Sequence, residues 1–285
     1  MAEAQTKLGQ YAECIVSATK AIDVNPEEWL AYPERAYCED IVGYHAAAIE
    51  DYKTSISHNS TDALMWYDLG FAQYNAGVYG EAVISYSKAL ELDPSYYPAY
   101  INRGLVYVKL EKYDEALVDY NHALQFGDVG PAYSGRGDTY FGLKKYDLAI
   151  ADYEKAISLM PDRPHSYCMV ALSYFEVGRY QDTLNAAKIS SKMDPACGGG
   201  RLFEYQARSY YALGDDDQAI LYMNKALQMG EYSLGYYYRG TIYQAAGQYE
   251  KAASDLNNFV ALVQDSSTYK TEIADAKKRL AELTP

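Results

Sequence analysis

A pattern of residues that recurs along the chain constrains its fold more than any other feature of the sequence. Four segments place a ring four residues before a glycine: Trp66 to Gly70, Tyr100 to Gly104, Tyr133 to Gly137 and Tyr236 to Gly240. After the first three of them, Tyr, Ala, Tyr and Ala recur at fixed spacing, as in Tyr79, Ala82, Tyr86 and Ala89. One copy spans about 34 residues, which is the length of a single supersecondary unit in repeat proteins. Such a unit cannot bury its apolar face alone, so the sequence predicts a stacked array.

Each copy is expected to form a hairpin of two helices. Apolar and small residues recur at helical spacing in two blocks, which a glycine turn separates. Each block has about 14 residues, too few for a stable isolated helix in water. Pro94, Pro161 and Pro195 are placed to end the second helix. Small pairs such as Gly70 with Ala82 let the two helices approach closely, and the rings at positions four and twenty-four fill the space between hairpins.

This repeat resembles the tetratricopeptide repeat, W-x2-L-G-x2-Y…A-x3-F…P, and the resemblance covers nearly the whole chain. It implies an all-α fold, an α-α superhelical solenoid built as a single array over residues 1–285. Seven full copies are expected, at 29–62, 63–96, 97–129, 130–163, 164–199, 200–232 and 233–266. A partial copy at 1–28 precedes them, and a polar capping helix is predicted at 267–285.

Three places depart from the regular pattern. Leu8 to Tyr11 matches the turn of a hairpin, which puts Ala2 in the middle of a first helix. We therefore expect the native polypeptide to extend beyond this N-terminus. The copy that ends at Phe126 to Gly130 lacks the proline. Pro195 to Gly200 is about two residues over length and carries three glycines, so it is a candidate hinge.

Charge and composition exclude several classes of partner. The formal net charge is −14 and the pI is about 4.7. Nucleic acids require a basic surface, and anionic membranes attract basic segments, so neither is expected as a ligand. No apolar run approaches the roughly 20 residues of a membrane helix, and no signal peptide is visible, so no membrane insertion is expected. A partner that is neutral or basic, with apolar side chains, is favoured.

The four cysteines are predicted to be free thiols. Cys14, Cys38, Cys168 and Cys197 include no C-x-x-C pair, and their spacing suits neither zinc nor a small disulfide framework. Free thiols and the lack of a signal peptide favour a cytoplasmic location. No cofactor and no metal are implied.

Three motifs resemble catalytic or ion-binding sites but have simpler explanations. Asp215 to Asp217 lacks the spacing of a calcium loop and is placed to cap a helix. Gly198 to Gly200 is not followed by the Lys-Ser/Thr of a phosphate loop, so we interpret it as a linker. Cys168 and His165 could share a helix face, but no orienting group or oxyanion site accompanies them. The sequence therefore predicts that the chain is not an enzyme.

The resemblance implies a binding surface on the first helix of each hairpin. In this family the second, fifth, ninth, twelfth and thirteenth residues of that helix point into a concave groove. The candidate groove residues are Tyr67, Phe71, Tyr74, Leu105, Val108, Asp138, Phe141, Leu172, Phe175, Arg201, Arg208 and Tyr211, with Cys168 and Glu204 at the same kind of position. Exposed aromatic patches usually mark binding surfaces, although a tightly wound superhelix could pack these rings internally.

One mechanism known in the family does not fit this chain. Chaperone-binding members hold a C-terminal carboxylate with Lys at the fifth position and Asn at the ninth. The fifth residues here are Pro33, Tyr67, Ile101, Ser134, Cys168, Glu204 and Tyr237. The ninth are Tyr37, Phe71, Leu105, Asp138, Leu172, Arg208 and Thr241. Because neither set contains Lys or Asn, the heat-shock chaperones are not expected to bind by this clamp.

The sequence thus predicts a scaffold for protein–protein interaction, which holds a peptide or protein segment in an apolar, aromatic-lined concave groove. Two alternatives remain open at this point. The array could be a self-assembly module that pairs with further copies of itself. It could instead be the recognition domain of a longer enzyme or signalling protein.

Four repeats carry Arg at the seventh position, where Leu is usual, and Asp sixteen residues later. These pairs are Arg35 with Asp51, Arg103 with Asp119, Arg136 with Asp152 and Arg239 with Asp255. The repeat with Leu69 has Ser85 at the later position instead. Since one residue lies on each helix of the hairpin, we predict four structural ion pairs within repeats.

Overall fold

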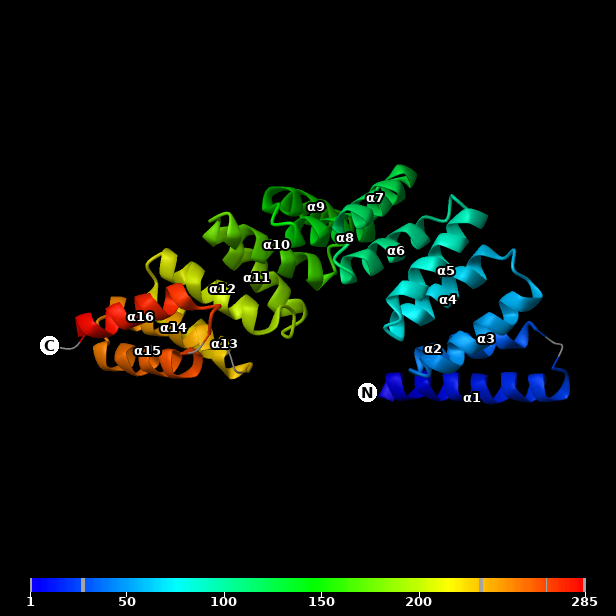
Figure 1. The fold of residues 1–285 in the computed structure, drawn as a ribbon, viewed down its shortest axis with the longest axis horizontal. Coiled ribbons are helices and arrows are strands. Elements are labelled where there is room, and N and C mark those ends of the chain that lie inside the picture. The colour runs from blue at the N-terminus through cyan, green and yellow to red at the C-terminus, as the bar shows by residue number, and fades with distance from the viewer. Residues whose placement is uncertain (1, 27–28, 231–232, 265, 284–285) are drawn as a thin grey trace. The chain divides into compact units, whose positions relative to one another are not determined.

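The computed structural model describes residues 2–26, 29–230, 233–264 and 266–283, and side chains from residue 9 onward. Within these ranges the chain forms sixteen α-helices and one short 3-10 helix, with no strand (Figure 1). The predicted all-α class is confirmed. The chain divides into two compact units, Met1–Leu143 and Lys144–Pro285. Each unit is described by itself.

The first unit contains eight α-helices that pack in sequence. They are α1 (Ala2–Val24), α2 (Ala31–Ile41), α3 (His45–His58), α4 (Ala63–Asn75), α5 (Tyr79–Leu92), α6 (Tyr97–Lys109), α7 (Tyr113–Ala123) and α8 (Gly130–Gly142), with the 3-10 helix η1 (Leu124–Phe126) after α7. Helices α2 and α3, α4 and α5, and α6 and α7 form hairpins. Among the first helices, α4 contacts α6, and α6 contacts α8. Their shared face is therefore continuous within this unit.

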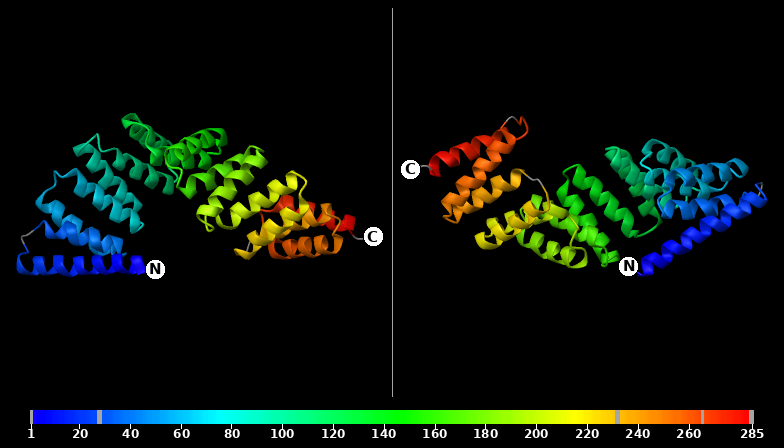
Figure 2. Two further views of the ribbon diagram at one scale, coloured as in Figure 1. Left: turned by 180° about the vertical axis from the view of Figure 1, so that it is seen from behind. Right: turned by 90° about the horizontal axis from the view of Figure 1, so that it is seen from below.

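The second unit contains the other eight α-helices. They are α9 (Tyr146–Leu159), α10 (Pro164–Glu176), α11 (Tyr180–Met193), α12 (Gly199–Ala212), α13 (Asp216–Gln228), α14 (Ser233–Ala245), α15 (Tyr249–Val263) and α16 (Lys270–Leu283). The last helix, α16, lies along α15 in each view (Figure 2). It covers the fully buried ring of Phe259, which packs with Tyr269, Ile273 and Ala276. The large ring of Phe259 thus fills the space between α15 and α16, which packs there as a single helix and not as part of a hairpin.

The turn inside each hairpin requires a left-handed backbone at one fixed position. Glycine occupies this position with positive φ at Gly43, Gly77, Gly178, Gly214 and Gly247. Two repeats instead place Glu111 and Lys144 there, each with a φ of 57°. Glycine has no Cβ and adopts this region at no steric cost, whereas Glu and Lys are strained in it.

The glycine of the repeated motif makes room for a buried tyrosine. Tyr86 and Tyr120, at position twenty-four, are almost fully buried. A Cβ placed on Gly70 would lie 2.9 Å from the Tyr86 ring, and one on Gly104 would lie 3.0 Å from the Tyr120 ring. The expectation that these glycines allow close approach is confirmed, but the group that approaches is the ring. A Cβ on Gly135, in the next first helix, would overlap Tyr120 as well.

Three of the four predicted Arg–Asp pairs are confirmed. In each, Nε and Nη2 of the arginine donate to the two carboxylate oxygens of the aspartate, at distances between 2.6 and 2.8 Å. These pairs are Arg35 with Asp51, Arg103 with Asp119 and Arg239 with Asp255. Arg136 and Asp152 lie in different units, so their pairing stays a prediction.

The expectation that all four cysteines are free is wrong. Cys14 of α1 and Cys38 of α2 form a disulfide, whereas Cys168 and Cys197 are free. The two residues are 24 apart in sequence, which is no recognisable disulfide spacing, but α1 packs on α2 and brings their Cα atoms to 6.4 Å. The inference of a reducing compartment from four free thiols therefore loses its basis.

The turn expected at Leu8 to Tyr11 is also absent from the structure. A single helix, α1, runs through these residues from Ala2 to Val24. A Cβ on Gly9 would meet nothing within 4 Å, so no packed ring requires a glycine there. A glycine inside a helix costs only about 1 kcal/mol, and the contact of α1 with α2 outweighs it.

Within the described residues, none of the helices is both long and apolar enough to cross a membrane.

Candidate functional site

Two adjacent pockets open along the first helices of the second unit. Helix α12 contacts α10 on one side and α14 on the other. A pocket of about 490 Å³ lies between α12, the end of α13 and α14, and a pocket of about 280 Å³ lies between α10, α12 and α14. Arg208 and Tyr238 line both pockets. We call this pair of pockets the α12 groove.

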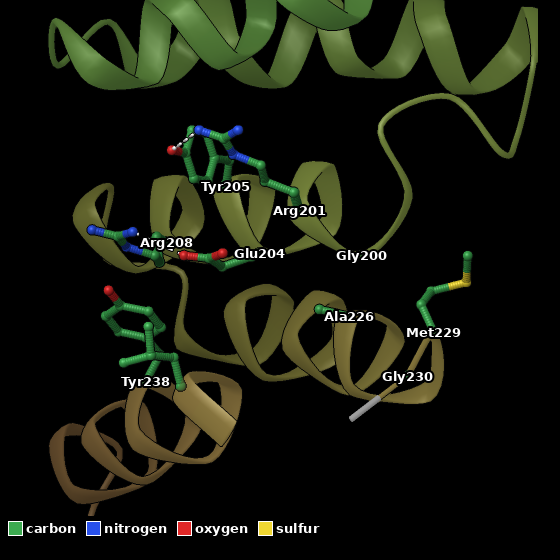
Figure 3. A pocket seen from close by; sticks show the side chains of 10 residues that line it. Gly200, Arg201, Glu204, Tyr205, Arg208, Ala226, Met229, Gly230 and Tyr238 are labelled. Carbon is green, nitrogen blue, oxygen red and sulfur yellow. Dashed lines mark hydrogen bonds and ion pairs between the residues drawn. The ribbon is translucent and has the colours of Figure 1, made fainter. Parts of the chain in front are cut away.

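Arg208 forms the wall between the two pockets. Its guanidinium carbon lies 4.6 Å from the centroid of the Phe175 ring and 4.4 Å from that of Tyr238. Its Nη1 donates to Oε1 of Glu204 at 2.9 Å, one helical turn earlier in α12. Figure 3 shows this ion pair, with Tyr238 of α14 on the side of Arg208 that faces away from α12. The guanidinium is thus held by α10, α12 and α14 together.

The surroundings of Arg208 keep it charged. Burial disfavours the charged form, but Tyr238 and Glu204 outweigh burial and raise the pKa of Arg208. The flat guanidinium suits contact with aromatic faces, because it is weakly hydrated and attracts the π electrons of the rings. The charge of Arg208 is balanced by Glu204, so this part of the groove is a nearly neutral surface.

A second hydrogen-bonded network lies beside the first on α12. Nη2 of Arg201 donates to the Tyr205 hydroxyl at 3.2 Å, and that hydroxyl donates to the carboxylate of Glu176 in α10. Burial, followed by the bond to Glu176, raises the pKa of Tyr205 to about 12. The Tyr205 ring packs against the Phe175 ring at a tilt of 34°, with 4.3 Å between centroids. These contacts fix α10 against α12.

Helix α16 holds one lining residue of the smaller pocket in place. Tyr237 of α14 lines it and donates its hydroxyl to Oδ2 of Asp275 in α16 at 2.8 Å. Burial, followed by Asp275, raises the pKa of Tyr237 to about 12. Tyr211 of α12 lines the same pocket and is 37% exposed. A ring that is exposed beside fixed rings is available to a ligand.

The side chains that line the α12 groove are mainly aromatic and charged groups. Its lining offers tyrosine rings, two arginines and a glutamate, but no pair of a nucleophile and a base. The one nucleophile candidate from the sequence, Cys168, is buried, and burial raises the pKa of its thiol to about 12. A catalytic cysteine that attacks a substrate needs both access to it and a lowered pKa. In the described part of the chain, no group of three or more His, Cys, Asp or Glu could hold a metal ion.

The structure places five sequence-predicted residues in the second unit. Phe175, Arg201, Arg208 and Tyr211 line the two pockets. Leu172 is only 3% exposed, because it lies on the packed side of α10. It offers no surface to a ligand, and neither does buried Cys168.

The other seven predicted residues lie in the first unit. Phe71 is 42% exposed on α4. Tyr67 is half-buried, with its ring 5.0 Å from that of Tyr96 and its hydroxyl accepting a hydrogen bond from Asn102 at 2.9 Å. The remaining members are half-buried on α4, α6 and α8, namely Tyr74, Leu105, Val108, Asp138 and Phe141. Of this set, Phe71 presents the most accessible ring.

Sequence reasoning missed two central rings, Tyr205 and Tyr238. Both occupy the sixth position of their repeats, which was not among the positions expected to face the groove. A signal was present, because the sixth residues are Glu34, Asp68, Asn102, Gly135, Met169, Tyr205 and Tyr238. Only the last two repeats place a tyrosine there, next to the only arginine at a ninth position, Arg208.

Comparison with protein families agrees with the helical hairpins. Models described as tetratricopeptide repeat match residues 97–126, 130–163, 203–228 and 235–266. A further model, described as TPR repeat, matches residues 75–111. Among curated proteins, no sequence matches this chain.

The solved structures with a similar fold include those of three different proteins. The APC/C hetero-tetramer Cut9-Hcn1 has a TM-score of 0.65 at 16% identity, over 96% of this chain and 53% of that chain. A tetratricopeptide repeat protein from Parabacteroides merdae has a TM-score of 0.60 at 23% identity, over 91% and 100%. YrrB, described as a TPR protein with an unusual peptide-binding site, has a TM-score of 0.54 at 24% identity, over 65% and 95%. The chain thus spans about half the length of the Cut9-Hcn1 chain, and these likenesses concern the fold.

Proposed function

The chain belongs to the tetratricopeptide repeat family, and we propose that it binds a segment of another protein in the α12 groove. Scaffolds of this family serve protein–protein interaction and are generally not enzymes. YrrB, which shares the fold, is described as having a peptide-binding site. Binding of a protein segment is therefore what the family leads us to expect, and the α12 groove is the surface that we propose for it.

The observation that carries the proposal is the position of Arg208 between Phe175 and Tyr238. Rings and guanidinium groups are the side chains most often found at the centre of protein interfaces. Here they are held in place before any ligand arrives, because Glu204 and the two rings fix Arg208. A binding surface that is already ordered loses little conformational entropy when the partner docks.

The balance of charge in the groove indicates the chemistry of the partner. Arg201 and Arg208 are offset by Glu204 and Glu176, which lie within their hydrogen-bonded networks. A ligand therefore meets flat, nearly neutral surface with tyrosine hydroxyls at its edge. We expect a peptide segment with apolar or aromatic side chains and without acidic clusters, because the chain as a whole carries a net charge of −14.

The first unit contributes a second surface in this proposal. Its candidate is α4, where Phe71 is exposed, followed by the half-buried groove positions of α6 and α8.

The test is a selection of peptides on the full chain. A library of random peptides is displayed on phage, selected on the wild-type protein and counter-selected on the Arg208→Met variant. The dissociation constants of the selected peptides are then measured by fluorescence anisotropy for the wild type and for Tyr211→Ala. We expect Tyr211→Ala to weaken binding at least tenfold, since truncation of a central ring costs about 2 kcal/mol at an interface hot spot.

Tyr249→Ala is the matched control, because Tyr249 begins α15, lines neither pocket and is 59% exposed. It should leave the dissociation constants within about twofold and, like Tyr211→Ala, change the unfolding free energy by about 0.5 kcal/mol or less. Phe71→Ala tests the first unit in the same way. The proposal is wrong if no peptide is enriched, or if the enriched peptides bind Tyr211→Ala and the wild type equally well.

A further inference from the structure

Two free thiols that are far apart in sequence lie near each other, beside the α12 groove. Cys168 is in the first half of α10, and Cys197 lies in the segment between α11 and α12. The Cys197 thiol is close enough to affect the ionisation of Cys168: after burial, it is the next cause that raises the pKa of the Cys168 thiol. The two residues are 29 positions apart, so the tertiary fold brings them together.

The backbone next to Cys197 lies directly against the Cys168 thiol. Gly198, which follows Cys197, has a φ of 78° and forms the N-cap of α12. A Cβ on Gly198 would lie 2.6 Å from the sulfur of Cys168, so the chain passes directly over that thiol. Ser190 of α11, which donates to the Pro164 carbonyl at 3.3 Å, also lies near Cys168 and lowers the pKa of its thiol. Cys168 therefore has neighbours on α11 and on the connecting segment that carries Cys197.

We propose that Cys168 and Cys197 form a reversible disulfide, which joins α10 to the start of α12. The two thiols differ in access, which sets the order of the steps. Cys168 is only 2% exposed, whereas Cys197 is partly exposed and can meet a small molecule. The proposal rests on this proximity and does not depend on peptide binding.

The oxidant would be a low-molecular-weight disulfide such as oxidised glutathione. The Cys197 thiolate attacks one sulfur of that disulfide, forms a mixed disulfide and releases one glutathione thiolate, which takes up a proton. The Cys168 sulfur then attacks the sulfur of Cys197, and the second glutathione leaves as a thiolate that takes the proton from Cys168. Two protein thiols are oxidised by two electrons in total, and one molecule of oxidised glutathione is reduced to two thiols.

The bond would tether the wall of the larger pocket. Gly200, three residues after Cys197, lines that pocket, and so does Arg201. In the reduced chain, Asp194 to Gly198 connects α11 with α12 without a covalent link to α10. In the oxidised chain the same segment is joined to α10 and loses conformational freedom in the unfolded state.

The experiment equilibrates the full chain with mixtures of reduced and oxidised glutathione. Remaining thiols are alkylated, and disulfide-linked peptides are identified by mass spectrometry without reduction. We expect the two free thiols of the wild type to disappear together, a linked peptide that contains Cys168 and Cys197, and a melting temperature several degrees above that of the reduced form. Cys168→Ser should stop at the mixed disulfide of Cys197 with glutathione, without the increase in melting temperature.

The Cys14→Ser/Cys38→Ser variant repeats the measurement without the disulfide that is already present, so exchange between the two pairs can be recognised. Three outcomes would overturn the proposal. Both thiols could remain open to alkylation after oxidation of the folded wild type. Cys197 could retain glutathione although Cys168 is present. A bond between Cys197 residues of two chains could form instead. Each outcome concerns the thiols alone, so peptide binding could fail or succeed independently.

Discussion

Arg103 holds Asp119 through two parallel hydrogen bonds, from Nε to Oδ2 at 2.8 Å and from Nη2 to Oδ1 at 2.7 Å. Its third group, Nη1, donates to Ser87 in the second helix of the preceding hairpin at 2.8 Å. Burial raises the pKa of Asp119, and the opposing effect of Arg103 does not fully offset it. Burial alone would lower the pKa of Arg103, but the interaction with Asp119 outweighs burial and raises it. The carboxylate therefore depends on this arginine to remain charged inside the fold.

Replacement of Arg103 by Leu should lower the unfolding free energy by about 3 kcal/mol, because Asp119 would stay buried without its partner. Urea denaturation followed by circular dichroism measures this. The double variant Arg103→Leu/Asp119→Ser creates the combination that the chain already uses at Leu69 and Ser85. It should recover at least half of the loss. If the double variant is less stable than Arg103→Leu alone, the pair does not act as a unit.

Replacement of Glu111 by Gly should stabilise the chain by about 0.5 kcal/mol. Glu111 has a φ of 57°, which costs a residue with a Cβ about 1–2 kcal/mol, and glycine removes that strain at a smaller entropic cost. Thermal unfolding of Glu111→Gly beside Glu111→Ala separates backbone strain from charge, because alanine keeps the strain. A gain of equal size in the alanine variant would contradict this explanation.

Replacement of Gly135 by Ala should destabilise the chain by about 1–3 kcal/mol, although alanine is the better helix former. The added methyl group would overlap the ring of Tyr120, which is 1% exposed and cannot move aside. Gly80→Ala is the control, since a Cβ on Gly80 in α5 meets nothing within 4 Å. This variant should be stabilised by up to about 1 kcal/mol. Melting curves of the two variants should therefore shift in opposite directions.

The stability of the first unit should fall as the pH rises from about 4 to about 7. Burial, followed by Asp62 and Asp40, raises the pKa of Asp68 to about 7, whereas an unfolded chain has an Asp pKa near 4. Between these values the folded state keeps a proton that the unfolded state has lost. Because the folded state binds more protons, the unfolding free energy decreases with rising pH across this window.

The Asp68→Asn variant isolates this effect. Asparagine cannot ionise, so the variant should be more stable than the wild type at pH 8 and close to it at pH 4. Asp114→Asn, at an exposed carboxyl in the first turn of α7, should leave the pH profile of the wild type unchanged. Denaturant midpoints measured at several pH values compare the three proteins. Parallel profiles for the wild type and Asp68→Asn would show that Asp68 ionises normally in the fold.

The repeated sequence by itself determines the fold class. The spacing of Gly70, Ala82 and their equivalents predicts helical hairpins, because small residues at these positions let the two helices of one repeat pack closely. The Arg–Asp pairs followed from the same register, since residues sixteen apart face each other across a hairpin. Both inferences depend on distances within one repeat, which the local geometry of two short helices sets.

Contacts between repeats were decided by the tertiary structure. The sequence shows Arg208 at the ninth position of the repeat that contains α12, and Tyr238 at the sixth position of the repeat that contains α14. It does not show that Arg208 lies between Phe175 and Tyr238. The same holds for Cys14 with Cys38, and for Cys168 with Cys197. Such contacts depend on how each hairpin is rotated against the next, and small changes in packed side-chain volume set that rotation. Local periodicity therefore determines each hairpin, whereas the packing between hairpins determines the groove and the pairing of the thiols.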